Sequence, residues 1–359
     1  MEKFFSVSEK NQDLECEGVK VHVLRLDTKA QLLLKPVFKL IWRKSTFPLA
    51  RWLYVAAMRG QIVEASRGVD VLHYFGNGPE MLGFAAEAAA RKIGAKFVIE
   101  PALHEGQWGD KWFDAILYKR ADLLLAHTRH EAGVLERMGI SPSKIRTIVH
   151  GVDFCDSGDG ERFLRKHGIA GPVVLFLGRK TKEKGVERLL NAWPGVAEKF
   201  PEATLVIAGP KSADFEKLKA EMRNSDEFLN PQSAEARTRI LNLDNLPEGE
   251  KQDALAACDL LCVPSEGESF GMVYFEAWFY KKPVVALDLP VLRETVGNAK
   301  AGLLVRDDYR NVADGICELL HNPHQRSEMG ERGCKFANEH EWTSSAKSYE
   351  FVYGKLSGC

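Results

Sequence analysis

Short runs of β-branched and aliphatic residues alternate along the chain with longer stretches of amphipathic helical pattern. The short runs predict buried strands, and the longer stretches predict helices that bury one face. In the first half, strands are predicted at Lys20–Leu26, Val69–Tyr74, Lys96–Ile99, Leu123–Ala126 and Ile145–Ile148. In the second half, they are predicted at Val173–Leu177, Ala203–Ile207, Ile240–Leu243, Leu260–Val263, Val284–Ala286 and Gly302–Val305. The predicted helices include Met81–Lys92, Gly185–Lys199, Gln252–Ala257 and Met272–Phe279.

This alternation is typical of an α/β fold with parallel sheets, and it occurs in two successive sets. A chain of 359 residues is also longer than one hydrophobic core usually serves. We therefore expect two Rossmann-like domains, residues 1–155 and 156–340, divided in the turn-rich segment Gly151–Gly160. Residues 341–359 are expected to pack back toward the first domain. They contain a predicted helix, Glu341–Leu356, whose Trp342, Tyr349 and Phe351 are expected to dock in a core.

The bulk composition is that of an ordinary globular protein. The formal net charge of −1 gives no general attraction to nucleic acid. The cysteines show no CxxC pair, which favours buried free thiols in a reducing cytoplasm. The first residues resemble no signal peptide, and no long apolar run predicts a membrane span. The expected localisation is cytoplasmic, with membrane association as a possibility.

A basic segment near the start departs from this balance. Residues 28–63 contain no Asp or Glu, and apolar and aromatic residues alternate there with cations. The cations are Lys29, Lys35, Lys39, Arg43, Lys44, Arg51 and Arg59. Such a segment fits either peripheral contact with an anionic membrane or a solvated basic face whose apolar side packs on the N-terminal sheet. The sequence does not decide between these two interpretations.

The most informative motif is the segment from Pro264 to Ala277, with Glu268 and Glu276 eight positions apart. It follows a predicted buried strand, and a helix is predicted to open at about Gly271. The first N–H groups of a helix suit a phosphate. Glu268 in the loop and Glu276 in the helix are therefore placed to reach opposite ends of one hydroxyl-rich ligand.

A second motif has the same strand-to-helix context. After Val173–Leu177 come Gly178 and Arg179, and then Lys184 and Gly185 before the next predicted helix. Two cations at such a turn can neutralise a pyrophosphate, and Arg adds bidentate geometry.

Together these motifs resemble those of the retaining GT-B glycosyltransferases of family 4, which carry E-x7-E and G-R-x4-K-G segments. The similarity extends over about Val69 to Tyr353 and includes Ala121–Thr128, Ile148–Asp153 and Leu205–Gly209. The resemblance implies a GT-B fold, in which two Rossmann-like domains face a central cleft. It also implies transfer of a hexose from a nucleotide-diphosphate sugar to an acceptor hydroxyl, with retention of anomeric configuration.

The resemblance also implies roles for individual residues. Arg179 and Lys184 would hold the diphosphate, Glu268 would orient the donor sugar, and Glu276 would bind the ribose. His104, at the position of a family histidine in the loop after Lys96–Ile99, would act near the reacting face of the sugar. Further donor-binding residues are expected at Gly178, Asn245, Ser269, Phe270, Gly271, Met272 and Val273. Glu105 and Trp108 are expected on the acceptor side.

No cofactor or metal is expected, because no D-x-D triplet is present to hold a divalent ion. The expected partners are a nucleotide sugar and a saccharide, lipid-linked or small-molecule acceptor, with no nucleic acid. Base, sugar and acceptor cannot be read from the sequence.

The chain departs from the family pattern at its start, where no glycine pair follows the short apolar segment Phe4–Val7. We therefore expect an N-terminal domain that lacks the usual first strand and glycine-rich loop. Smaller departures are Lys281 and His150, where glycine and asparagine are usual. The missing glycine-rich loop motivates an alternative function, a nucleotide-sugar-binding protein that is catalytically weak or regulatory. An epimerase or a phosphorylase of the same fold is a third, less favoured alternative.

Overall fold

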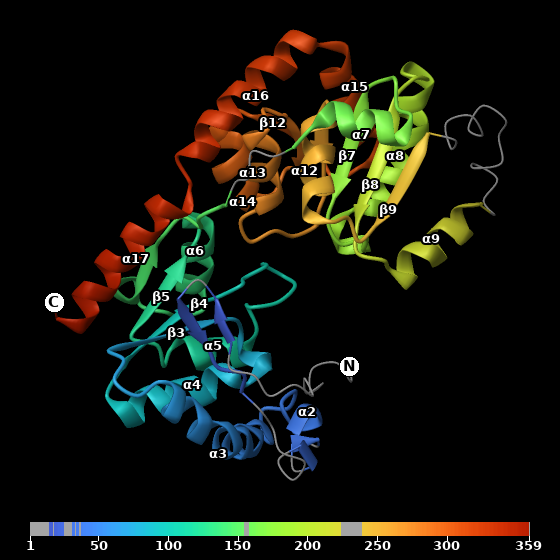
Figure 1. Ribbon diagram of the computed structural model, residues 1–359. Coiled ribbons are helices and arrows are strands. Elements are labelled where there is room, and N and C mark those ends of the chain that lie inside the picture. Colours follow the sequence, from blue (N-terminus) through green and yellow to red (C-terminus); the bar gives the residue numbers. More distant parts are fainter. Residues whose placement is uncertain are drawn as a thin grey trace. The chain divides into compact units, whose positions relative to one another are not determined.

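The computed structural model describes residues 14–16, 18–24, 31–32, 34–35, 37–153, 158–223 and 239–358. These residues form two compact units. Unit 1 takes its residues from Met1–Ala126, Glu131–Ile148 and Tyr349–Cys359, and unit 2 from His127–His130 and Val149–Ser348. The strands and helices of each alternate along the chain (Figure 1).

Unit 2 is built on a six-stranded parallel sheet of order β12-β11-β10-β7-β8-β9. Its strands are β7 (Val173–Leu177), β8 (Thr204–Gly209), β9 (Ile240–Asp244), β10 (Leu260–Cys262), β11 (Val284–Leu287) and β12 (Gly302–Val305). The helices are α7 (Gly160–His167), α8 (Val186–Lys199), α9 (Ala213–Arg223), α12 (Glu248–Ala257), α13 (Met272–Phe279), α15 (Tyr309–His321) and α16 (Pro323–Asn338). Short helical turns lie at η4 (Lys182–Lys184), α14 (Pro290–Leu292) and η5 (Arg293–Gly297). Every residue of β7 and β10 is buried, as expected for central strands of a parallel sheet covered on both faces.

Unit 1 has a four-stranded parallel sheet of order β3-β4-β5-β6. Its strands are β3 (Val71–Phe75), β4 (Lys96–Glu100), β5 (Leu123–Ala126) and β6 (Ile145–Thr147). The helices and turns are α2 (Val37–Leu40), α3 (Phe47–Ala65), η2 (Gly78–Glu80), α4 (Leu82–Ile93), α5 (Trp112–Tyr118), α6 (Arg129–Arg137) and η3 (Pro142–Lys144).

The two faces of this sheet belong to different apolar clusters. Phe97 and Ile99 of β4 pack with α3 and α4, whereas Val98 packs with Tyr349 of α17 (Trp342–Ser357). The alternation along one strand follows from its two-residue repeat.

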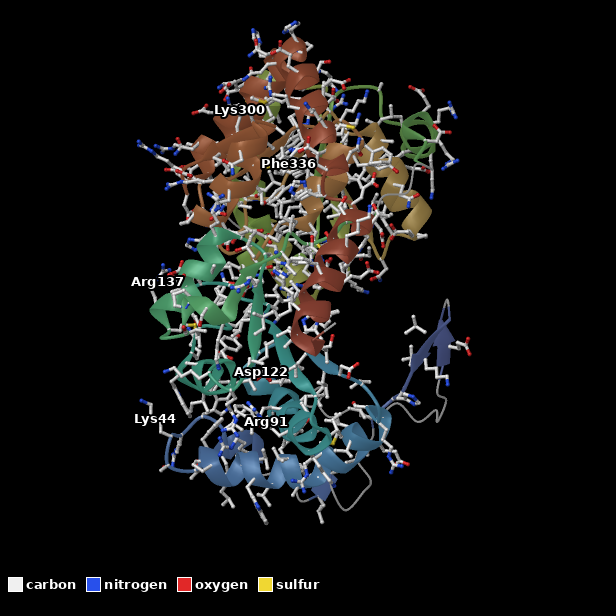
Figure 2. The ribbon with its side chains drawn as sticks, turned by 90° about the vertical axis from the view of Figure 1, so that its left-hand side faces the viewer. Lys44, Arg91, Asp122, Arg137, Lys300 and Phe336 are labelled. Carbon is white, nitrogen blue, oxygen red and sulfur yellow. The ribbon has the colours of Figure 1, made fainter. Side chains whose placement is uncertain are left out.

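The same local device joins neighbouring strands in both units. Asp122 in unit 1, labelled in Figure 2, precedes β5 and accepts a hydrogen bond of 2.8 Å from the backbone N–H of Phe97 in β4. Asp259 precedes β10 and accepts one of 2.8 Å from Val173 in β7. Each aspartate also donates its own N–H to the neighbouring strand. The carboxylates thereby extend the ladder at the start of the strand.

Ten of the predicted strands are present, with ends shifted by a few residues, and the predicted helices are confirmed. The strand predicted at Lys20–Leu26 is confirmed only in part, because the described strand ends at Val21, and residues 25 and 26 lie outside the described residues. β2 (Val19–Val21) pairs antiparallel with β1 (Leu14–Cys16) in a separate two-stranded sheet, with Val19 and Val21 exposed. An alternating pattern predicts a strand but not its partner, so the sequence could not tell a sheet strand from a hairpin strand. The Phe4–Val7 prediction lies outside the described residues.

The predictions for the C-terminal helix and for the cysteines are confirmed in part. Tyr349 is buried against the unit 1 sheet, but Phe351 is 63% exposed, so the expectation that Phe351 docks in a core is wrong. Cys258, Cys262 and Cys317 are free and buried. Among the described residues, no helix combines the length and apolar character needed to cross a bilayer.

Candidate functional site

The two motifs follow neighbouring strands at the centre of the unit 2 sheet. β7 pairs in parallel with β10, with Leu175 beside Leu261, so the segments after both strands leave the same edge. The chain crosses here from the half containing β8 and β9 to the half containing β10, β11 and β12. Open α/β sheets bind ligands at such a topological switch point, beyond the carboxyl ends of the strands.

An ion pair connects the two motifs directly. Lys184 Nζ lies 2.7 Å from Glu268 Oε1, and the Glu268 side chain is only 7% exposed. A buried carboxylate is costly unless a cation pairs with it. Lys184 therefore pairs with the Glu268 carboxylate and holds this side chain in place.

The loop backbones also meet closely at Gly185. Gly185 has φ +78°, and a Cβ added there would lie 2.0 Å from the carbonyl oxygen of Pro264. Arg188, one turn into α8, donates a hydrogen bond of 2.9 Å from Nη1 to that same oxygen. Gly185 thus permits an approach that a larger residue would block.

Helix α13 begins after Gly271, as predicted. Gly271 has φ +85°, and a Cβ there would lie 2.6 Å from the Tyr274 ring. The glycine is therefore required by the packing of the protein itself. Phe270 is buried and stacks on Phe275 at 4.7 Å, whereas Met272 is exposed and Ser269 and Val273 are half-buried. The side chain of Phe270 thus belongs to the core. At the start of α13, a ligand could reach the backbone groups beside Phe270 and the exposed side chain of Met272.

Glu276 lies one turn into α13 and contacts Lys251 of α12. Lys251 Nζ lies 3.3 Å from Glu276 Oε1 and 2.7 Å from Glu248 Oε1. Burial alone would lower the pKa of Lys251, but the carboxylates of Glu248 and Glu276 raise it. These side chains line a cavity of about 270 Å³ together with Asp153, Gln252, Leu255, Phe279 and Tyr280.

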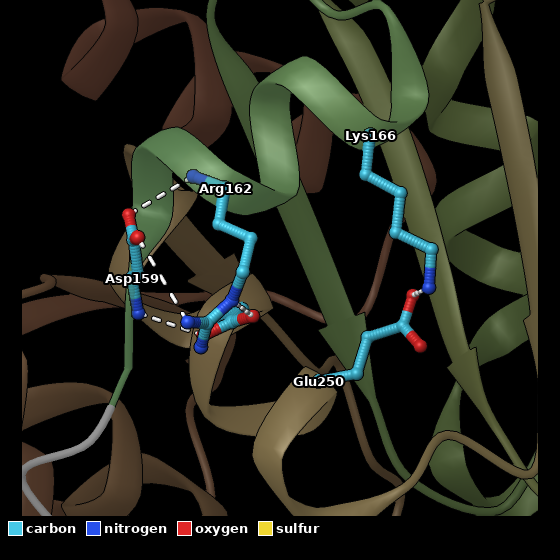
Figure 3. A network of polar contacts seen from close by, with 5 residues as sticks. Asp159, Arg162, Lys166 and Glu250 are labelled. Carbon is cyan, nitrogen blue, oxygen red and sulfur yellow. Dashed lines mark hydrogen bonds and ion pairs between the residues drawn. The ribbon is translucent and has the colours of Figure 1, made fainter.

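A clamp between α7 and α12 fixes the helix that carries Lys251 (Figure 3). Arg162 of α7 makes two hydrogen bonds of 2.6 Å to the buried carboxylate of Asp253, and Lys166 lies 2.7 Å from Glu250. The Arg162 hydrogen bonds hold the pKa of Asp253 below its usual value.

Lys180 was not identified by the sequence analysis, and its side chain is completely buried. Its ammonium donates hydrogen bonds to Asn242 Oδ1 at 2.7 Å and to Leu243 O at 2.9 Å, and it pairs with Asp244. Lys180 thereby anchors the segment after β9 to the segment after β7. In the run from Arg179 to Lys184 nothing distinguishes a buried lysine from its exposed neighbours, so no sequence signal could have identified it.

The remaining predicted donor residues lie around this anchor. Arg179 is exposed, and it forms no ion pair with any residue in the described ranges. Gly178 follows β7 directly, with φ +154°. Asn245 has φ +53°, and its N–H donates to Gly209 O at 3.1 Å. The structure therefore brings together Arg179, Lys184, Glu268 and the start of α13 on segments that leave one sheet edge.

A larger cavity of about 370 Å³ adjoins the same loops but suits a diphosphate poorly. Its lining includes the carboxylates of Glu187, Glu266, Asp307 and Asp308, against the cations of Lys182 and Arg188. Arg188 is engaged by Asp307 at 2.6 Å. The net negative lining would repel an anionic ligand.

The predicted acceptor-side residues lie in unit 1, in the loop after β4. His104 and Trp108 form an isolated antiparallel bridge, with their ring centres 4.5 Å apart. The loop is closed by Asp110, which accepts a hydrogen bond of 2.5 Å from the N–H of Gly106. Glu105 is exposed and pairs with Arg137 at 2.6 Å. The imidazole and indole thus sit on a short, hydrogen-bonded loop.

Comparisons with known proteins agree with both units. The family model "Glycosyl transferases group 1" matches residues 160–336, and "Glycosyl transferase 4-like domain" matches residues 5–151. A phosphatidyl-myo-inositol mannosyltransferase of Mycobacterium leprae is 33% identical over 186 residues, which are 51% of this chain and 46% of that protein. A D-inositol 3-phosphate glycosyltransferase of Corynebacterium urealyticum is 30% identical over 248 residues, 66% of this chain and 57% of the other. The matched region thus spans about half the length of these curated relatives.

Solved structures share the fold at lower identity. An α,α-trehalose-phosphate synthase from Burkholderia vietnamiensis has a TM-score of 0.75 at 13% identity, covering 96% of this chain and 87% of that one. HepE from Anabaena, solved with UDP-glucose, has a TM-score of 0.71 at 19% identity, covering 95% and 87%. The fold is therefore that of the GT-B glycosyltransferases, and the chain belongs to the group 1 glycosyl transferases, family 4.

Proposed function

We propose that this protein is a retaining hexosyltransferase that moves a hexose from a nucleotide-diphosphate sugar to an acceptor hydroxyl without a metal ion. The observation that carries the proposal is the Lys184–Glu268 pair at 2.7 Å, which unites the two motifs at the switch point of the unit 2 sheet. A cation and a carboxylate fixed there suit a ligand with an anionic centre and hydroxyl groups.

The donor would lie along the segments after β7, β9 and β10. Arg179 and Lys184, with the first N–H groups of α13, would hold the diphosphate, since helix N-termini and guanidinium groups both favour phosphate. Glu268 would accept hydrogen bonds from the donor sugar, and Glu276 from the ribose hydroxyls. Gly178, Ser269, Met272 and Val273 would contribute backbone contacts, and Asn245 would lie near the base.

The reaction would break the bond between the anomeric carbon and the diphosphate oxygen and form a bond to the acceptor oxygen on the same face. The proton of the acceptor hydroxyl would leave with the diphosphate. Negative charge grows on the departing oxygen, and Arg179 and Lys184 would stabilise it. His104 would hydrogen-bond the donor sugar or orient the acceptor hydroxyl, with Glu105 and Trp108 on the acceptor side.

The names of the relatives suggest which acceptors to test first. Both relatives described above are named for inositol-containing molecules, one of them a lipid. We therefore propose polyol phosphates and lipid-linked polyols as acceptors. Buried free thiols such as Cys258 fit a reducing cytoplasm, where we expect the protein to act.

The test is donor hydrolysis and transfer by the Arg179→Ala and Glu276→Ala variants, with nucleotide sugars first ranked by thermal shift. Ligands of the native state raise its stability by mass action, so the screen needs no acceptor. Both variants should lose turnover, while Arg165→Ala, an exposed arginine on α7, should retain it. Unchanged turnover in Arg179→Ala and Glu276→Ala would contradict the proposal. Tight donor binding with no product from any acceptor would favour the alternative, a binding protein with little catalytic activity.

A further inference from the structure

Helix α3 is apolar on both of its faces. Its inner face consists of Phe47, Ala50, Tyr54, Met58 and Ile62, all buried in the unit 1 core. A helix on a protein surface usually turns a charged or polar face to water, and one that is apolar all round is usually covered.

The opposite face of α3, made of Leu49, Trp52, Ala56 and Arg59, is exposed. Trp52 is 65% exposed and Leu49 53% exposed. The spacing of 3, 4 and 3 positions puts the four side chains on one stripe of the helix. A tryptophan has a large apolar surface to bury, so the outer face of α3 offers substantial binding energy to a partner.

Cations predominate around this face, although Glu64 in the last turn of α3 is exposed. Arg59 lies on it, and Lys39, Arg43 and Lys44 are exposed in the residues just before α3. Lys44 is labelled in Figure 2, and its ammonium lies 5.9 Å from the ring centre of Trp112. Across residues 28–63 of the sequence there is no Asp or Glu. A protein surface usually mixes both signs evenly, so a face on which cations outnumber acids is complementary to an anionic surface.

We propose that the outer face of α3 docks the protein on an anionic phospholipid membrane. Trp52 and Leu49 would enter the headgroup region, and Arg43, Lys44 and Arg59 would contact lipid phosphates. Tryptophan at the level of the headgroups beside basic residues is the composition of interfacial helices. Both interpretations left open by the sequence then apply to one helix, because its inner face packs on the core and its outer face binds lipid.

The test measures sedimentation of the full chain with vesicles of phosphatidylcholine alone and of equimolar phosphatidylcholine and phosphatidylglycerol. We expect binding to the anionic vesicles that falls with added salt, since exposed charges are screened within about 10 Å at 0.1 M. Trp52→Ser should weaken this binding on the order of tenfold. Arg43→Glu/Arg59→Glu should weaken it at least as much, because each cation near an anionic surface contributes roughly fivefold.

Matched controls separate this face from the rest of the surface. Phe351→Ser removes another exposed aromatic residue, which lies on α17, and Lys335→Glu/Lys347→Glu reverses two exposed cations on α16 and α17. Both controls should bind like the parent protein. Circular dichroism checks that each variant is folded. Should Trp52→Ser not fold, amide hydrogen exchange of the unaltered protein with and without vesicles should show protection in residues 47–56.

The proposal is independent of the enzymatic one, because binding is measured without donor or acceptor. Equal binding to neutral and anionic vesicles would overturn it, as would loss of binding in the controls as large as in the α3 variants. No vesicle binding, together with a concentration-dependent dimer that Trp52→Ser abolishes, would overturn it in favour of a second copy of the chain as the partner.

Discussion

Lys184 Nζ lies 2.7 Å from Glu268 Oε1, so residues 84 positions apart form an ion pair at one edge of the unit 2 sheet. Without its partner, Glu268 would be a carboxylate with a side chain 7% exposed. The pair thus combines a structural role with the proposed binding role, and the two can be separated experimentally.

Replacing Lys184 with Met should destabilise unit 2 by about 2–4 kcal/mol at neutral pH, because it leaves a buried carboxylate unpaired. Denaturant unfolding at neutral pH measures this loss. Lys182→Met is the control, because Lys182 is exposed and its ion pair with Glu187 is long, at 3.9 Å. This variant should change the free energy of unfolding by less than about 1 kcal/mol. Equal losses in both variants would show that the Lys184–Glu268 pair has no special weight.

The sequence predicted the parts of the fold that depend on local pattern. The buried runs Val173–Leu177 and Leu260–Val263 predicted β7 and β10, and Gly271 predicted the start of α13. Their pairing is a long-range event that no local pattern encodes. Hence the sequence placed Lys184 and Glu268 in separate motifs and could not show their ion pair.

Lys180 and Lys20–Leu26 illustrate what the sequence could not supply. The burial of Lys180 depends on Asn242, Leu243 and Asp244, which approach only when β9 has joined the sheet. The pattern at Lys20–Leu26 is that of a strand, but Val19 and Val21 of β2 are exposed, because among the described residues β2 pairs only with β1. In both cases the tertiary partner decides the environment of the residue.

Glu276→Ala should weaken binding of a nucleoside diphosphate on the order of tenfold to a hundredfold, because a hydrogen bond to a charged group contributes about 1.5–3 kcal/mol. The loss should disappear for a 2′,3′-dideoxy ligand, which has no ribose hydroxyl to donate. Calorimetry with both ligands measures how the loss in Glu276→Ala depends on the ribose hydroxyls. Glu248→Ala, which removes the other carboxylate beside Lys251, is the control and should bind both ligands like the parent protein. If Glu276→Ala weakened both ligands equally, Glu276 would not be the ribose partner.

Lys180→Met should cost about 1–3 kcal/mol of unfolding free energy, because it leaves the half-buried acceptors of Asn242 and Leu243 without this donor. It should also loosen the segment after β9, which faster amide exchange over residues 242–246 would reveal. Lys199→Met changes an exposed lysine of the same unit, which pairs with Asp314, and should leave exchange in this segment unaltered. Normal exchange in Lys180→Met would mean that the segment is held by other contacts.

Asp114 should make a measurable pH-dependent contribution to the stability of unit 1. Burial raises the pKa of its carboxyl from 3.8 to about 6, although the N–H groups of Lys111 and Gly78 oppose the shift. The folded state therefore binds a proton that the unfolded state has released, and stability falls as the pH rises from about 4 to about 6. Relative to Asp114→Asn, the parent protein should lose up to about 3 kcal/mol across this window, measured by denaturant unfolding at each pH.

Asp253 is the control, because its contribution to stability should change with pH in the opposite direction. Arg162 lowers the pKa of its carboxyl, so its stabilising contribution is present above the unfolded pKa and is lost as the pH falls. Relative to Asp253→Asn, the parent protein should therefore lose stability on acidification below about pH 4. If stability relative to the Asn variant changed with pH in the same direction for Asp114 and Asp253, this account of their burial and pairing would be refuted.

Gly185→Ala tests the contact that joins the two motif loops. The added Cβ would lie 2.0 Å from Pro264 O, at a backbone φ of +78° that disfavours any L side chain. Gly168→Ala is a matched control, because Gly168 has φ +65° but nothing within 4 Å of its Cβ position. The control should lose only about 1–2 kcal/mol of stability, which is the conformational cost of placing an L residue at this φ. Gly185→Ala should lose more and should also weaken nucleoside diphosphate binding, because relief of the clash moves the Lys184 loop away from Glu268. Equal stability losses and unchanged ligand affinity in the two variants would show that the approach of the loops is not needed for binding.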